Sequence, residues 1–165
     1  MNKKSWIEKL NNSKDLPQIK IFTEEQIKKL KSRWNVKAGD TMIIPSPLEV
    51  NQLMKKIPKG KLITINEIRN ILSKKYNTTI ACPITTGIFA WISANAAEEE
   101  LKMGRKRITP YWRTLKSNGE INQKYPGGIK KQIKMLEKEG FEIICKGKRF
   151  YVKDYERYLV KNLEL

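Results

Sequence analysis

Residues 64–101 read TINEIRNILSKKYNTTIACPITTGIFAWISANAAEEEL, and this stretch predicts two helices joined by a turn. Thr64 to Glu67 has the form of a capping box, which starts a helix by satisfying its first free backbone N–H groups. The apolar positions that follow recur at helical spacing and are Ile65, Ile68, Ile71 and Leu72. After Cys82-Pro83, a second helix is expected from about Thr85 to Leu101. Two helices joined by a turn in the middle of a basic chain favour a helix-turn-helix.

Similar start and stop signals place the neighbouring helices. Ser46-Pro47-Leu48-Glu49 combines a capping serine, a proline at the first helical position and a glutamate that closes the box. That helix is expected to stop at Pro58. A final helix is expected from Gly128 to Gly140. A β-hairpin is then expected from Phe141–Cys145 and Phe150–Lys153.

The segment before Ser46 offers weaker signals. A short amphipathic turn surrounds Trp6, and a capping box at Thr23–Gln26 predicts a helix that continues to Gly39. We therefore expect a mostly α fold with a small β-hairpin, which is an α+β, winged-helix-like helix-turn-helix domain. Residues 1–45 would form a helical extension and residues 46–165 the domain itself.

The charge balance points to a polyanionic partner. The 165 residues include 34 Lys and Arg against 17 Asp and Glu, a net charge of +17, and no histidine. Residues 101–126 alone contain seven Lys or Arg side chains and one Glu. Because cations gain affinity by displacing counterions from phosphates, nucleic acid is the natural ligand. The alternative is a lysine-rich surface that serves solubility.

The absence of histidine from the sequence excludes histidine general-base chemistry and zinc sites built on histidine. Two cysteines, Cys82 and Cys145, provide neither a disulfide framework nor metal-site spacing. The polar N-terminus does not have the pattern of a signal peptide, and the weakly polar run Ile84–Ala97 is too short to span a bilayer. We expect a cytoplasmic protein that needs no cofactor.

Four short motifs in order carry a resemblance to a known family. They are Pro110-Tyr111-Trp112-Arg113, Asn118-Gly119, Tyr125-Pro126-Gly127-Gly128 and Glu139-Gly140. Their order and spacing resemble the active-site segment of the alkylguanine-DNA alkyltransferases, the methylated-DNA–protein-cysteine methyltransferase family. The similarity extends over about Ser46 to Ile144. It implies that family's DNA-binding helix-turn-helix domain.

The resemblance also implies that the family's chemistry is lost here. The family has Pro-Cys-His-Arg at the first motif, so Tyr111 replaces the alkyl-accepting cysteine and Trp112 the histidine that activates it. A phenol with a reference pKa near 10 is a poor nucleophile at neutral pH, and an indole N–H cannot act as a base. Glu139 matches the glutamate that orients the histidine, and without a histidine we expect it to form a salt bridge or pack at the helix end. No arginine lies in residues 78–95 to enter the base stack.

The closest class is therefore the alkyltransferase-like proteins, which lack the cysteine, bind alkylated DNA and pass it to other repair proteins. We predict no catalytic residue and no metal ligand. The expected lesion-pocket residues are Pro110, Tyr111, Trp112, Tyr125, Pro126, Gly127 and Glu139. The expected DNA contacts are Thr85, Thr86, Gly87, Lys102, Arg105, Lys106, Arg107, Arg113 and Lys116. For the basic residues, the alternative is a solvated loop.

The expected partners are DNA, double-stranded and alkylated, and a repair protein. We expect a monomer with no membrane contact. Two other functions stay open: an active alkyltransferase-type or other enzyme that uses the same pocket, and a winged-helix module that binds proteins. Cys82 would be the thiol of such an enzyme, although free cysteines are more often buried and structural.

Overall fold

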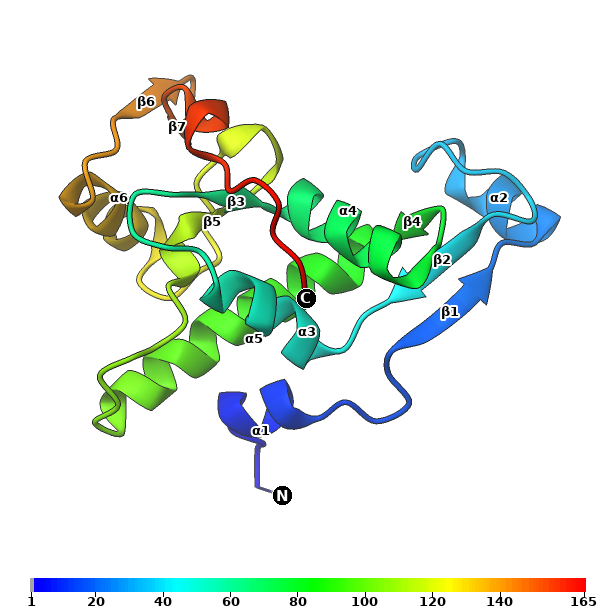
Figure 1. Ribbon diagram of the computed structural model, residues 1–165, viewed down its shortest axis with the longest axis horizontal. Helices are drawn as coiled ribbons and strands as arrows, with labels where there is room; N and C mark the ends of the chain where they lie inside the picture. Colours follow the sequence, from blue (N-terminus) through cyan, green and yellow to red (C-terminus); the bar gives the residue numbers. More distant parts are fainter. Residues whose placement is uncertain (1) are drawn as a thin grey trace.

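The computed structural model describes residues 2–165, which form an α+β fold with three small sheets (Figure 1). The α-helices are α1 (Trp6–Asn11), α2 (Glu24–Leu30), α3 (Pro47–Lys55), α4 (Ile65–Tyr76), α5 (Pro83–Lys102) and α6 (Gly128–Lys138). The strands are β1 (Gln18–Ile21), β2 (Thr41–Ile44), β3 (Ile63–Thr64), β4 (Ile80–Ala81), β5 (Thr114–Leu115), β6 (Ile143–Lys146) and β7 (Arg149–Val152). Three short 3-10 helices are η1 (Tyr111–Arg113), η2 (Ser117–Gly119) and η3 (Tyr155–Tyr158). The predicted α+β class is confirmed.

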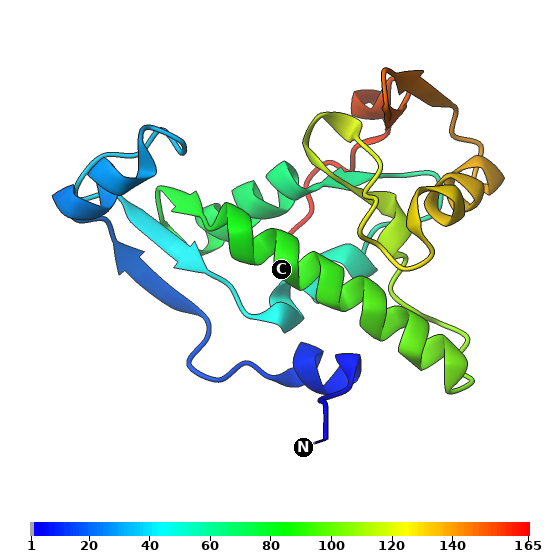
Figure 2. The same cartoon turned by 180° about the vertical axis from the view of Figure 1, so that it is seen from behind.

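The long helix α5 lies at the centre of the fold. Figure 2 shows it crossing the molecule, with the N-terminal strands near its first turn and residues 103–109 at its far end. Its small side chains Ala90, Ala94 and Ala97 are fully buried, so the neighbouring helices α1, α3 and α4 approach it closely. The side of α5 that carries these alanines is therefore part of the core.

The predicted capping boxes form at the starts of α3 and α4. Ser46 Oγ accepts from the Glu49 N–H at 3.3 Å, and the Glu49 carboxylate accepts from the Ser46 N–H at 2.9 Å. The same reciprocal arrangement links Thr64 and Glu67. α5 begins at Pro83, two residues before the predicted start, because proline at the first helical position needs no backbone partner.

The helix-turn-helix pair is α4 and α5, joined by residues 77–82. Asn77 ends α4 in the left-handed conformation, with φ of 51°. β4 lies in this connection and pairs in parallel with β2, which also pairs antiparallel with β1. Residues 2–45 are therefore hydrogen-bonded to the rest of the chain through the β2–β4 pair. The division at residue 45 stays a prediction.

The prediction for residues 24–39 is wrong in length. α2 ends at Leu30, because Lys31 and Ser32 adopt positive φ values of 48° and 62°. The side chain of Trp34 packs edge-on against Phe22 instead, with ring centroids 6.4 Å apart.

The predicted C-terminal helix and hairpin are confirmed. β6 and β7 pair from Ile143↔Val152 to Lys146↔Arg149, which leaves Gly147 and Lys148 as the turn. The hairpin follows α6, and β7 forms an isolated bridge from Tyr151 to Glu120. The part carrying α6 and the hairpin lies at the end of the molecule opposite to β1, β2 and α2 (Figure 1).

Candidate nucleic-acid interface

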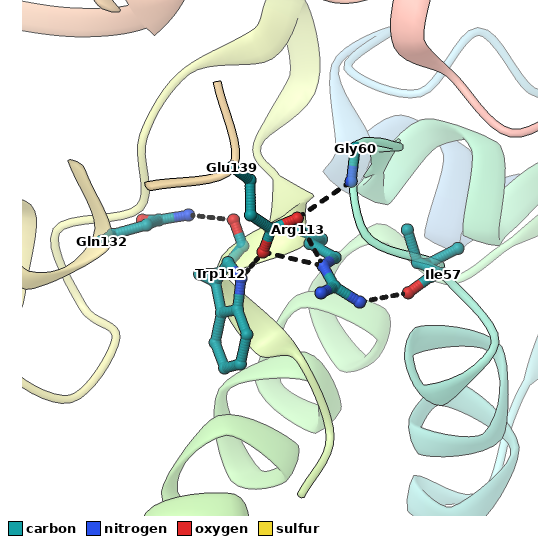
Figure 3. Close-up of polar contacts among 6 residues, drawn as sticks. All are labelled: Ile57, Gly60, Trp112, Arg113, Gln132 and Glu139. Carbon is teal, nitrogen blue, oxygen red and sulfur yellow. Dashed lines mark hydrogen bonds and ion pairs between the residues drawn. The ribbon is translucent and has the colours of Figure 1, made fainter. Parts of the chain in front are cut away.

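Glu139 joins three separate segments through one carboxylate (Figure 3). It accepts hydrogen bonds from Trp112 Nε1 at 2.5 Å, from Arg113 Nε at 2.9 Å and from the Gly60 N–H at 3.0 Å. Arg113 also donates from Nη1 to the Ile57 carbonyl at 2.7 Å. The Glu139 and Arg113 side chains are only 7% and 14% exposed. This buried ion pair confirms the expected salt-bridge role of Glu139.

The position of Arg113 differs from the prediction. All of its described contacts are internal, to Glu139 and Ile57, so its guanidinium is not presented to a phosphate. Glu139 also fixes the orientation of the Trp112 ring through its bond to Nε1. Gln132 Nε2 donates to the Trp112 carbonyl at 3.2 Å and holds the backbone at the same residue. The Trp112-Arg113 pair is therefore part of the scaffold in this fold.

Tyr111, at the position of the family's cysteine, lies in the core. Its side chain is fully buried, and its hydroxyl donates to Glu98 Oε1 at 2.6 Å. The ring packs edge-on against Trp112 and Tyr125, with centroids 5.4 Å and 5.5 Å away. Burial, and next the hydrogen bond to Glu98, raise the pKa of Tyr111 well above its usual value. Tyr111, Trp112 and Tyr125 thus form one packed aromatic cluster.

The Glu98 carboxylate also forms an ion pair with Lys131, whose Nζ lies 2.5 Å from Oε1. The stem of Lys131 crosses Gly127, where an added Cβ would lie 2.3 Å from Lys131 Cδ. Gly127 also has φ of 81°, a conformation that favours glycine. Gly127 thus allows Lys131 of α6 to reach the Glu98 carboxylate of α5, which also accepts from the Tyr111 hydroxyl.

The structure therefore brings most of the predicted pocket residues together as packed core. Pro110 and Tyr125 are buried, Pro126 is half-buried, and Gly127 is exposed. Two open grooves of the structure, one at α5 and one at α6, have neither these residues nor Tyr111, Trp112 and Glu139 in their lining.

An open groove of about 720 Å³ lies between the first turns of α5 and residues 116–124. The α5 side presents Ile84, Gly87, Ile88 and Trp91, and Ile65 from α4 adjoins them. Ile84 and Ile88 are 55% and 44% exposed. The opposite wall is polar and consists of Lys116, Ser117, Asn118, Glu120, Asn122, Gln123 and Lys124. Amide, hydroxyl and ammonium groups, with the Glu120 carboxylate 3.5 Å from Lys116 Nζ, thus face the apolar side of α5.

This groove contains two of the predicted DNA contacts, Gly87 and Lys116. The predicted DNA contact at Thr86 is wrong, because its side chain is fully buried and its hydroxyl donates to the Cys82 carbonyl at 2.7 Å. The Thr85 hydroxyl is also inaccessible to solvent. The exposed position of Ile88 was not expected from the sequence, since apolar residues at helical spacing indicate core more often than an exposed wall.

The predicted basic cluster lies elsewhere. Lys102, Arg105, Lys106 and Arg107 are exposed at the C-terminal end of α5, and Arg105 Nη1 lies 3.3 Å from Glu100 Oε1. Because α5 has 20 residues, it is about 30 Å long. The groove and the basic cluster are therefore two separate surfaces near opposite ends of one helix.

Cys82 is buried beside Phe22 and Met42, while Cys145 is exposed. The Cys82 backbone N–H donates to the Ile43 carbonyl at 2.9 Å. Within residues 2–165, no three His, Cys, Asp or Glu side chains are grouped to hold a metal ion. In the same described part of the chain, no helix has the length and apolar composition needed to cross a membrane.

Comparisons with known proteins give only distant similarity. No protein-family model and no curated protein matches the chain. Among solved structures, S. pombe Atl1 in complex with damaged DNA containing O6-carboxymethylguanine is similar with a TM-score of 0.46 and 22% identity. That alignment covers 70% of this chain and 94% of the other. A structure of S. pombe ATL in complex with DNA has a TM-score of 0.45 and 21% identity over the same shares.

Proposed function

We propose that this protein binds DNA without catalysing alkyl transfer, and that the groove between α5 and residues 116–124 is its contact surface. The observation that carries the proposal is the composition of the groove. One wall offers exposed Ile84 and Ile88 beside half-buried Trp91, and the other offers amides and lysines around the Glu120 carboxylate. The protein's net charge of +17 favours a polyanionic ligand for this surface.

Each wall has a defined role in this proposal. Gly87 has no side chain, and a Cβ built there would meet nothing within 4 Å, so a nucleic-acid backbone or base can approach α5 closely. Asn118, Asn122 and Gln123 each provide both donors and acceptors for base edges. Lys116 and Lys124 lie at the same wall and would contact phosphates.

The geometry of Tyr111 supports a binding function rather than an enzymatic one. A buried phenol that donates to Glu98, with its pKa raised by burial, is protonated at neutral pH and inaccessible to a substrate. A modified base would therefore lie in the groove and not against Tyr111. Following the sequence resemblance, we propose an alkylated or otherwise damaged base in double-stranded DNA as the preferred ligand, within DNA repair.

The test is fluorescence anisotropy with two labelled duplexes that differ only in guanine or O6-methylguanine at one position. We expect binding to both at low salt, and at least tenfold tighter binding to the modified duplex. Lys116→Glu with Lys124→Glu should weaken binding to both at least tenfold. Lys20→Glu with Lys28→Glu, two exposed lysines of β1 and α2, makes the same charge change away from the groove and should have little effect.

Three results would contradict parts of the proposal. A salt-independent affinity would exclude a phosphate-dominated complex. Equal, weak binding to both duplexes would favour nonspecific binding or a protein-interaction module over damage recognition. An added methyl group on Tyr111 or Cys82, detected by intact-protein mass spectrometry after incubation with the modified duplex, would establish the enzyme alternative.

A further inference from the structure

A second groove, of about 820 Å³, lies on the outer face of α6 beside β7. Three of its residues, Ile129, Ile133 and Phe150, are half-buried apolar side chains that pack onto the C-terminal core. Its exposed residues are Lys130, Lys134 and Lys138 and one carboxylate, Glu137, so the lining keeps an excess of positive charge. It shares no residue with the groove at α5.

The three lysines form one line along the helix. Residues four apart lie on the same side of an α-helix, so Lys130, Lys134 and Lys138 follow one another over two turns. Within residues 2–165, none of them takes part in an ion pair. Like charges at this spacing repel one another, so the three lysines do not stabilise α6 through contacts with each other in the free protein.

We propose that this face of α6 binds an acidic amphipathic helix of another protein. The apolar strip of Ile129, Ile133 and Phe150 would receive the apolar face of the partner, and the lysine row would pair with carboxylates along its edge. In helix-in-groove recognition of this kind the bound helix carries apolar anchors at i, i+3, i+4 and i+7, and here they would contact Ile129, Ile133 and Phe150. An occupant of about three turns covers the lysine row.

Charge and apolarity together select this partner over two others. A second copy of the chain would also carry +17, so it would be repelled from a lysine row. A DNA backbone would pair with the lysines but would leave Ile129 and Ile133 without an apolar contact. An acidic amphipathic helix satisfies both features of the groove.

The experiment uses the full chain labelled with 15N and a synthetic 14-residue helical peptide. The peptide carries Leu at i, i+4 and i+7 and Glu on the adjoining positions, and its control replaces each Glu with Gln. We expect the acidic peptide to shift the amide signals of residues 129–138 and of Phe150. The Gln peptide should bind at least tenfold more weakly, because it retains only the apolar contact.

Two double variants with equal charge change complete the test. Lys130→Glu with Lys134→Glu should weaken binding of the acidic peptide at least tenfold, while Lys20→Glu with Lys28→Glu should leave it unchanged.

The proposal is overturned if the acidic peptide shifts no α6 signal, or if the Gln peptide binds equally well. It is also overturned if duplex DNA shifts the α6 signals and K130E/K134E weakens DNA binding tenfold, since that result assigns the face to DNA. Failure here leaves the proposed DNA groove intact, because that groove is tested through residues 84–91 and 116–124.

Discussion

Loss of the Glu139 carboxylate should destabilise the fold strongly. Its carboxylate neutralises the buried Arg113 guanidinium and also accepts from Trp112 and Gly60. In Glu139→Ala, Arg113 would keep only the Ile57 carbonyl as a partner. Removing one member of a buried ion pair leaves an uncompensated charge, so we expect a loss of about 3–5 kcal/mol in the free energy of unfolding. Urea denaturation measures it.

A matched control for this prediction is Glu142→Ala. The Glu142 side chain is 69% exposed and lies 3.6 Å from Lys153. An exposed pair of this kind contributes about 0–1 kcal/mol, so the control should lose no more than that. If Glu139→Ala lost as little as the control, the carboxylate would not be the link between the three segments.

Tyr111 gives a pH-dependent prediction. Its pKa is raised by burial and by Glu98, so the folded state holds the phenolic proton to higher pH than the unfolded state, where the pKa is near 10. Its stabilising contribution is therefore complete below about pH 10 and is lost as the pH rises further, by up to about 1.4 kcal/mol per pH unit. Tyr111→Phe has no phenol to ionise. It should show a shallower fall in the free energy of unfolding between pH 10 and 11.5, measured by urea denaturation, and an unchanged slope would refute this assignment.

At the scale of elements, local signals predicted helix starts well and exposure poorly. Ser46–Glu49 and Thr64–Glu67 form their capping boxes as expected, because these contacts depend only on residues three positions apart. The groove at α5 could not be predicted in this way. Whether Ile88 faces the core or solvent depends on residues 116–124, which are distant in sequence and lie opposite it.

Substitutions at Gly87 should affect the stability of α5 and its DNA affinity differently. It lies in the interior of a 20-residue helix and a Cβ there would meet nothing within 4 Å, so Gly87→Ala should stabilise the protein by about 0.5–1 kcal/mol. If DNA approaches α5 at this point, the larger Gly87→Leu should bind DNA at least tenfold more weakly while staying folded. Thermal unfolding and fluorescence anisotropy measure the two effects. DNA affinity that is unchanged in Gly87→Leu would move the contact away from this turn.

At the scale of the whole molecule, the sequence predicted the order of the helices, the C-terminal hairpin and the excess of positive charge, but neither the strands β1 to β5 nor how distant segments meet. The parallel pairs β2–β4 and β3–β5 join residues far apart in the chain, and strands of two residues carry no pattern to detect. The same limitation affected Arg113, whose charge indicated a phosphate contact until its position beside Glu139 was known.

The basic cluster and the groove can contact one DNA molecule only if the duplex is long enough. α5 is about 30 Å long, and one turn of duplex, about ten base pairs, covers about 34 Å. We therefore expect affinity to rise steeply as the duplex lengthens from six to about twelve base pairs. Replacing Lys102, Arg105, Lys106 and Arg107 with Ala should remove this gain. The fall of log K with log salt should also become less steep, by about 0.9 for each phosphate that the variant no longer neutralises, with equal effect on guanine and O6-methylguanine duplexes.

Replacing the exposed Lys14, Lys20, Lys28 and Lys37 with Ala removes the same charge and should change the slope much less. Equal reductions in the two variants would mean that net charge, rather than these two surfaces, determines binding.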